Sequence, residues 1–69
     1  MNISDLLNSG SKILKNNKVK SHQLDSEVVL SSLMKKSREN LIINSNQKVS
    51  KNTIINFEKL ITRRAKKEP

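Results

Sequence analysis

The chain has 69 residues, no cysteine, one aromatic residue and a formal net charge of +8 at pH 7. The missing cysteines exclude a disulfide framework and a thiolate metal site. Apolar runs such as Leu41–Ile43 reach only three residues, and the N-terminus lacks the apolar segment of a secretory signal; these features exclude a membrane span and an export signal. We therefore expect one small cytoplasmic domain, and its high charge favours a monomer.

The first predicted helix begins near Ser4. Asn2 or Ser4 can cap its N-terminus, and Asp5 suits the positive end of the helix dipole. Its apolar residues recur with helical spacing and form one face: Leu6, Leu7, Gly10, Ile13 and Leu14. A glycine inside a helix costs about 1 kcal/mol relative to alanine. Gly10 therefore indicates either the close approach of another helix or random drift.

The second predicted helix has Ser21 as its N-cap and ends near Lys35. Its apolar residues surround most of the helix: Leu24, Val28, Val29, Leu30, Leu33 and Met34. This pattern is typical of a helix with neighbours on most sides, so we expect it to be the centre of the fold. Asp25 and Glu27 are interpreted as acids that favour a helix start, and His22 as an exposed first-turn residue.

A short third helix is predicted over residues 38–43, capped by Ser37. Its apolar run, Leu41–Ile43, is expected to be buried. A helix-turn-helix could be drawn through residues 21–43, with Arg38 and Asn40 at the start of its second helix. That helix is too short to present several side chains to base edges, so a DNA-reading motif is not favoured.

The last predicted helix begins after Ser50, and Val49 can pack on Ile54 as a hydrophobic staple. The apolar arc of this helix consists of Ile54, Phe57, Leu60, Ile61 and Ala65. Four cations lie near the negative end of its dipole, namely Arg63, Arg64, Lys66 and Lys67, and Pro69 stops the helix. The predicted fold is all-α, a compact bundle of four to five short helices.

The sequence carries no arrangement typical of catalysis. Gly10 stands alone, which excludes a glycine-rich phosphate loop. His22 is the sole histidine, and no neighbouring residue would orient it as a base. Asp25 and Glu27 are two residues apart and therefore face different sides of a helix. We expect no catalytic residue, cofactor site or metal site in these 69 residues, which are not an enzyme by themselves.

The positive charge raises one alternative, a free-standing basic helical module that binds nucleic acid. The lysines are scattered along the chain, and the joint abundance of lysine, asparagine, isoleucine and serine is what AT-rich coding produces. A single aromatic residue, Phe57, also gives no platform on which bases could stack. A solvated basic surface is therefore favoured over a dedicated polyanion site.

Three segments together resemble the N-terminal helical domain of the HemK-type release-factor glutamine methyltransferases. They are Leu24-Asp-Ser-Glu-Val-Val-Leu30, Lys36-Ser-Arg-Glu-Asn-Leu-Ile42 and Leu60-Ile-Thr-Arg-Arg-Ala-Lys-Lys-Glu-Pro69. The last segment is the most specific, because it is similar to the end of that domain, where the chain enters the methyltransferase domain. Two positions depart from the family pattern: Gln23 replaces the usual arginine, and Ser26 the usual alanine.

The resemblance implies that residues 1–69 are the N-terminal substrate-recognition domain of a longer enzyme. The full-length enzyme would use S-adenosylmethionine to methylate the side-chain nitrogen of the glutamine in the Gly-Gly-Gln tip of peptide-chain release factors. The helical domain would help to bind the release factor. The family's S-adenosylmethionine loop and Asn-Pro-Pro-Tyr motif are not in this chain, so no catalytic residue can be assigned here.

Exposed basic positions are the candidate contacts with the release factor or with the catalytic domain. They form two groups: Lys35, Lys36 and Arg38 after the second helix, and Arg63 and Arg64 near the hinge. Taken one at a time, each is more simply interpreted as a solvated charge. A further alternative is a structural cap that stabilises the catalytic domain without touching the release factor.

Overall fold

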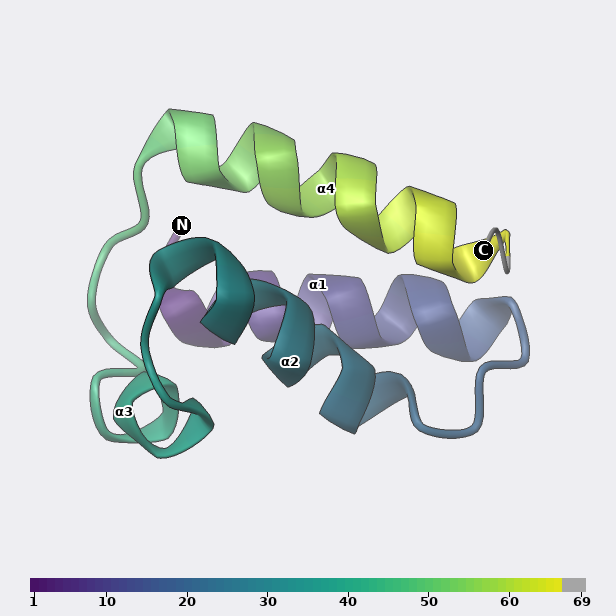
Figure 1. Ribbon diagram of the computed structural model, residues 1–69, viewed down its shortest axis with the longest axis horizontal. Coiled ribbons are helices and arrows are strands. Elements are labelled where there is room, and N and C mark those ends of the chain that lie inside the picture. The colour runs from purple at the N-terminus through teal and green to yellow at the C-terminus, as the bar shows by residue number, and fades with distance from the viewer. Residues whose placement is uncertain (67–69) are drawn as a thin grey trace.

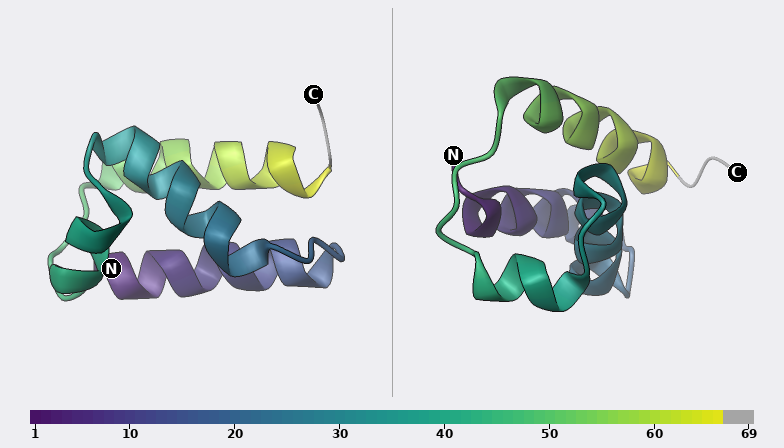
Figure 2. Two further views of the ribbon diagram at one scale, coloured as in Figure 1. Left: turned by 60° about the horizontal axis from the view of Figure 1, so that its bottom comes forward. Right: turned by 60° about the vertical axis from the view of Figure 1, so that its left-hand side comes forward.

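The computed structural model describes residues 1–66, which contain four α-helices. Figure 1 shows α1 (Ile3–Asn16), α2 (His22–Met34), α3 (Arg38–Ile43) and α4 (Lys51–Ala65). Helices α1 and α4 run in the same direction and contact each other, α2 runs in the opposite direction and packs against both, and α3 lies at one end (Figure 2). The prediction of an all-α bundle of four to five helices is confirmed. No helix within residues 1–66 is long and apolar enough to cross a membrane.

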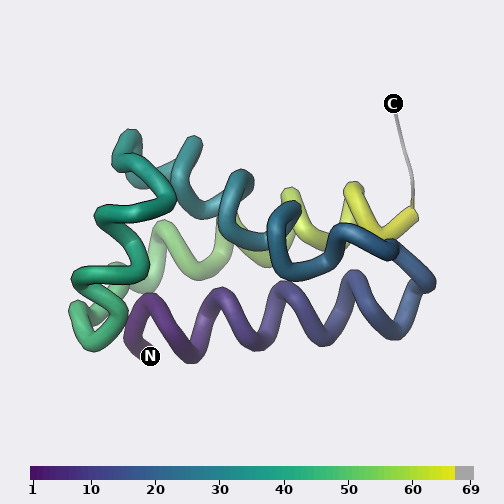
Figure 3. Tube along the Cα trace, turned by 90° about the horizontal axis from the view of Figure 1, so that it is seen from below, coloured from purple at the N-terminus to yellow at the C-terminus, as the bar shows by residue number. Residues whose placement is uncertain are grey.

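The first helix starts one residue earlier than predicted, at Ile3, with Asn2 as the cap. The Asn2 side chain accepts a hydrogen bond from the Asp5 backbone N–H, and the Asp5 carboxylate accepts one from the Asn2 N–H, which makes a capping box. The loop after α3 satisfies the next two donors: Ile3 N–H donates to Gln47 O and Ser4 N–H to Ser45 O. Figure 3 shows this loop beside the start of α1.

Two of the three serine caps form as predicted. The Ser37 hydroxyl accepts a hydrogen bond from Asn40 N–H at 3.0 Å, and the Ser50 hydroxyl accepts one from Thr53 N–H at 3.2 Å. Ser21 does occupy the N-cap position of α2, but its side chain makes no capping hydrogen bond. The predictions for Lys67 and Pro69 at the end of α4 lie outside the described residues; the helix itself ends at Ala65.

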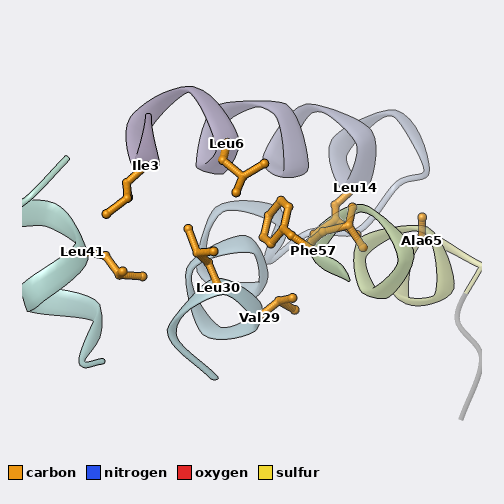
Figure 4. Close-up of a cluster of buried hydrophobic side chains, with 9 residues drawn as sticks. Ile3, Leu6, Leu14, Val29, Leu30, Leu41, Phe57 and Ala65 are labelled. Carbon is orange, nitrogen blue, oxygen red and sulfur yellow. The ribbon is translucent and has the colours of Figure 1, made fainter. Parts of the chain in front are cut away.

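All four helices contribute buried apolar side chains to the core, α3 only one: Ile3, Leu6, Leu14, Val29, Leu30, Leu41, Phe57, Ile61 and Ala65. In Figure 4 the Phe57 ring lies among Leu6, Leu14 and Leu30. Gly10 is buried where α1 crosses α4: a Cβ there would lie 2.6 Å from Phe57 Cζ and 2.7 Å from Ser26 Oγ. The close approach of another helix at Gly10 is therefore confirmed.

Three predictions about burial are wrong. Helix α2 packs against each of the other helices, as expected of a central helix, but Leu24 and Val28 of its predicted apolar surface are exposed. Leu60 of α4 is exposed as well. For Leu24 and Val28 the cause is geometric, because α1, α3 and α4 cover one side of α2 and leave its outer side open to solvent. Leu60 likewise lies on a side of α4 that its contacts with α1 and α2 leave open.

The third helix also departs from the prediction. Only Leu41 is buried, whereas Ile42 and Ile43 are exposed. A helix of six residues makes fewer than two turns, and it packs on α2 with one side only. Two of its three consecutive apolar residues must therefore face away from that contact.

Candidate partner-binding surface

Arg38, one of the predicted contact residues, joins α3 to α2. Its Nη2 lies 3.0 Å from Glu27 Oε1, and its Nε donates to the same oxygen at 3.1 Å. The Glu27 carboxylate is largely covered, while the guanidinium is half exposed. The ion pair therefore links α2 to α3. Only the exposed outer edge of the Arg38 guanidinium is accessible to a partner protein.

Arg64 makes an equivalent link between α4 and α2. Its Nε lies 3.4 Å from Asp25 Oδ2, and again the acid is the more covered member of the pair. Asp25 does lie in the first turn of α2, as the helix-start interpretation requires, but that interpretation is incomplete for both Asp25 and Glu27. Each pairs with an arginine that is distant in sequence, because its side of α2 faces a different neighbouring helix.

Lys35 and Lys36 lie in the connection from α2 to α3, and both side chains are exposed. Lys35 ends α2 in the left-handed conformation, with φ of 54°. The backbone of Lys36 is fixed by Ser31: Lys36 N–H donates to Ser31 O, and the Ser31 hydroxyl donates to Lys36 O. The junction therefore holds two lysines on an ordered backbone close to Arg38.

The predicted contact residues do not form one site. Lys35, Lys36 and Arg38 lie at the α2–α3 junction, and Arg63 and Arg64 lie near the end of α4, toward opposite ends of the molecule (Figure 1). The two arginines of α4 border hollows that the sequence did not predict. An open groove of about 750 Å³ has Arg63 and Leu60 in its lining, and a cavity of about 270 Å³ has Arg64 and Leu60.

Apolar side chains that the helices within residues 1–66 leave partly or largely exposed line these hollows. Leu33 and Ile55 line the larger groove, and Val28 lines the smaller cavity. The sequence does carry a signal for this surface. An α2 that is apolar on most sides needs more neighbours than three other helices supply, so part of that apolar surface has to remain open.

A third hollow, of about 430 Å³, is lined by residues of α1, α2, α3 and the loop after α3, and its lining is mainly polar. Its lining includes Ser11, Gln23 and Glu27. The Ser11 hydroxyl lies 2.6 Å from His22 Nδ1, so His22 is partly buried and bonded rather than an exposed first-turn residue. Glu27 is already engaged with Arg38. Within residues 1–66 no group of histidine and acidic side chains is placed to hold a metal ion.

Comparison with known families gives one match. Residues 5–69 match the family model described as the PrmC N-terminal domain. No curated protein and no solved structure matches the chain. The matched range includes all four helices except the first two residues of α1, and it therefore contains both predicted basic groups and the hollows between α2 and α4.

Proposed function

Since the chain belongs to the PrmC N-terminal domain family of the release-factor glutamine methyltransferases, we propose that it binds a peptide-chain release factor and positions it for methylation. The methyltransferase chemistry would come from a catalytic domain that is not in these 69 residues and that uses S-adenosylmethionine. The acceptor would be the glutamine of the Gly-Gly-Gln tip, and the reaction would take place in the cytoplasm, where release factors act.

The family match is the observation that carries this proposal. Two structural features support it. The domain has a closed core, so it can present a fixed surface. Within residues 1–66, basic and apolar side chains are also exposed on the outer faces of α2 and α4. Such a surface suits binding to a protein rather than catalysis.

The physical benefit of a second binding surface is selectivity. A catalytic pocket that holds one glutamine and its two glycine neighbours contacts too little surface to select one protein among many. A separate contact on a linked domain adds binding energy and raises the effective concentration of the tip at the active site. The domain would thus act on the affinity for the intact release factor and leave the chemical step unchanged.

An NMR titration tests the binding role. The 69-residue chain, labelled with ¹⁵N, is titrated with a purified release factor of the same organism up to about 1 mM, which reveals a Kd of about 1 mM or tighter. We expect a subset of backbone signals to shift or broaden in a saturable way. An unchanged spectrum over the whole titration would contradict the proposed function.

A further inference from the structure

Four of the large apolar side chains that are exposed in residues 1–66 lie on the outer faces of two adjacent helices. Leu24 and Val28 are one turn apart on α2, and Ile55 and Leu60 belong to α4; each is between 38% and 44% exposed. The others, Met1, Ile42 and Ile43, lie toward the end of the bundle where α3 packs. The exposed apolar side chains of α2 and α4 are therefore separate from those at the α3 end of the bundle.

The shape of this surface is a groove. Leu60 belongs to the lining of both the 750 Å³ hollow and the 270 Å³ cavity, so the two adjoin at this residue. The apolar lining of the combined groove includes Leu33, Val28, Val29 and Leu60. These residues come from α2 and α4, which run antiparallel (Figure 1). We call the combined groove the α2–α4 groove. An open apolar channel between two helices fits a row of side chains from a third helix.

The rim of the groove carries positive charge. Its lining includes three cations, Lys59, Arg63 and Arg64, and one acid, Glu58. Asp25 holds Arg64 at the edge of the groove by the 3.4 Å contact. Together with the net charge of +8, this arrangement favours an acidic partner over a basic one.

The apolar floor also separates two classes of acidic partner. Nucleic acid binds through phosphates and through bases stacked on aromatic rings, and the only aromatic residue, Phe57, is buried in the core. A bound phosphate backbone would leave the aliphatic side chains of the groove in contact with water. An amphipathic helix, in contrast, can cover them with its own apolar side chains and place carboxylates next to the cations.

We propose that the α2–α4 groove receives an amphipathic helical segment of the release factor. The apolar ridge of that segment packs on Val28, Ile55 and Leu60, and its acidic flank meets Lys59 and the arginines of α4. This inference rests on the proposed function, because it assigns the surface and the chemistry through which the release factor is bound.

Mapping the NMR titration onto the structure separates this inference from the proposed function. We expect the largest changes at residues 28, 55 and 60, which line the groove. Saturable changes confined to α1 and α3 would overturn the assignment of the α2–α4 groove as the binding surface, but they would still support the proposed function. No change anywhere would overturn both. Matching changes at the same residues on addition of a single-stranded RNA oligonucleotide at about 0.15 M salt would overturn the assignment of a protein helix.

Two substitutions and a matched control provide the second test. Leu60→Glu and Val28→Glu each place a carboxylate on the floor of the groove, and Ile43→Glu places the same group on an isoleucine that is 80% exposed on α3. We expect the groove variants to weaken binding about tenfold or more and the control to change it less than about twofold. Equal effects of Leu60→Glu and Ile43→Glu would overturn the inference.

A charge reversal on the rim completes the test. Lys59→Glu is expected to weaken binding several-fold at low salt, with a smaller effect at high salt, because rim charges act mainly through long-range attraction. The far-UV circular dichroism and thermal midpoint of each variant show that it is folded. A folded Lys59→Glu variant that binds more tightly than the parent would contradict the acidic flank of the partner.

Discussion

Replacing Gly10 by alanine tests the packing at the centre of the domain. Two effects oppose each other. Alanine improves the helix propensity of α1 by about 1 kcal/mol. The added Cβ, however, would lie 2.6 Å and 2.8 Å from two ring carbons of Phe57 and 2.7 Å from Ser26 Oγ. Real Cβ contacts are longer than this, so a neighbouring group would have to move.

Movement of either neighbour, Phe57 or Ser26, would cost free energy of folding. Phe57 is buried among the core side chains, and the Ser26 hydroxyl donates a hydrogen bond to Leu7 O at 2.8 Å. Overpacking of a tight core costs about 1–3 kcal/mol, and three short contacts favour the upper end. The net expectation for Gly10→Ala is a free energy of unfolding that is lower by about 2 kcal/mol. This corresponds to a thermal midpoint lower by about 8–16 °C for a domain of this size.

Thermal and urea unfolding, followed by circular dichroism at the helix band, measure the effect. Asn8→Ala is the matched control, because Asn8 is exposed on the same helix; its free energy of unfolding is expected to rise by up to about 0.6 kcal/mol. Phe57→Leu should be less harmful in the Gly10→Ala background than alone, since the smaller side chain relieves the contact. A Gly10→Ala variant more stable than the parent would refute the reasoning.

Three further predictions concern the ends of the helices and the ion pairs, each measured by urea unfolding. Lys35→Gly should raise the free energy of unfolding by about 0.5–1 kcal/mol, because glycine adopts a φ of 54° without strain; its control, Lys36→Gly, should lower it, and equal shifts would contradict the left-handed cap. Asn2→Ala should cost about 1 kcal/mol through loss of the capping box, whereas Asn2→Asp should cost little. Arg38→Gln should cost about 0.5–1 kcal/mol by leaving Glu27 unpaired, and a cost unchanged in 1 M salt would argue against the ion pair.

Local features of the fold can be predicted from the sequence because their causes are local. Ser37 and Ser50 each precede a helical pattern, which predicts them as caps, and both accept the expected backbone hydrogen bond. The bounds of α3 agree with the prediction for the same reason. Gly10 is different: the sequence leaves a close helix crossing and random drift open, and only the packed structure, with Phe57 against Gly10, decides between them.

Features that depend on which helices meet could not be predicted. The pairs of Asp25 with Arg64 and Glu27 with Arg38 join residues 39 and 11 positions apart, and no periodic pattern identifies such partners. The exposure of Ile43 follows from the side on which α3 packs. The α2–α4 groove has the same origin, since the outer faces of two helices become one surface only after the bundle has formed.

The most direct test of the recognition role compares two substrates of the full-length methyltransferase with and without residues 1–69. One substrate is the intact release factor, and the other is a short peptide that contains the Gly-Gly-Gln sequence. We predict that the deletion raises KM for the intact release factor by about tenfold or more and leaves kcat/KM for the peptide unchanged. Equal kinetics of both enzymes on the intact release factor would contradict the recognition role.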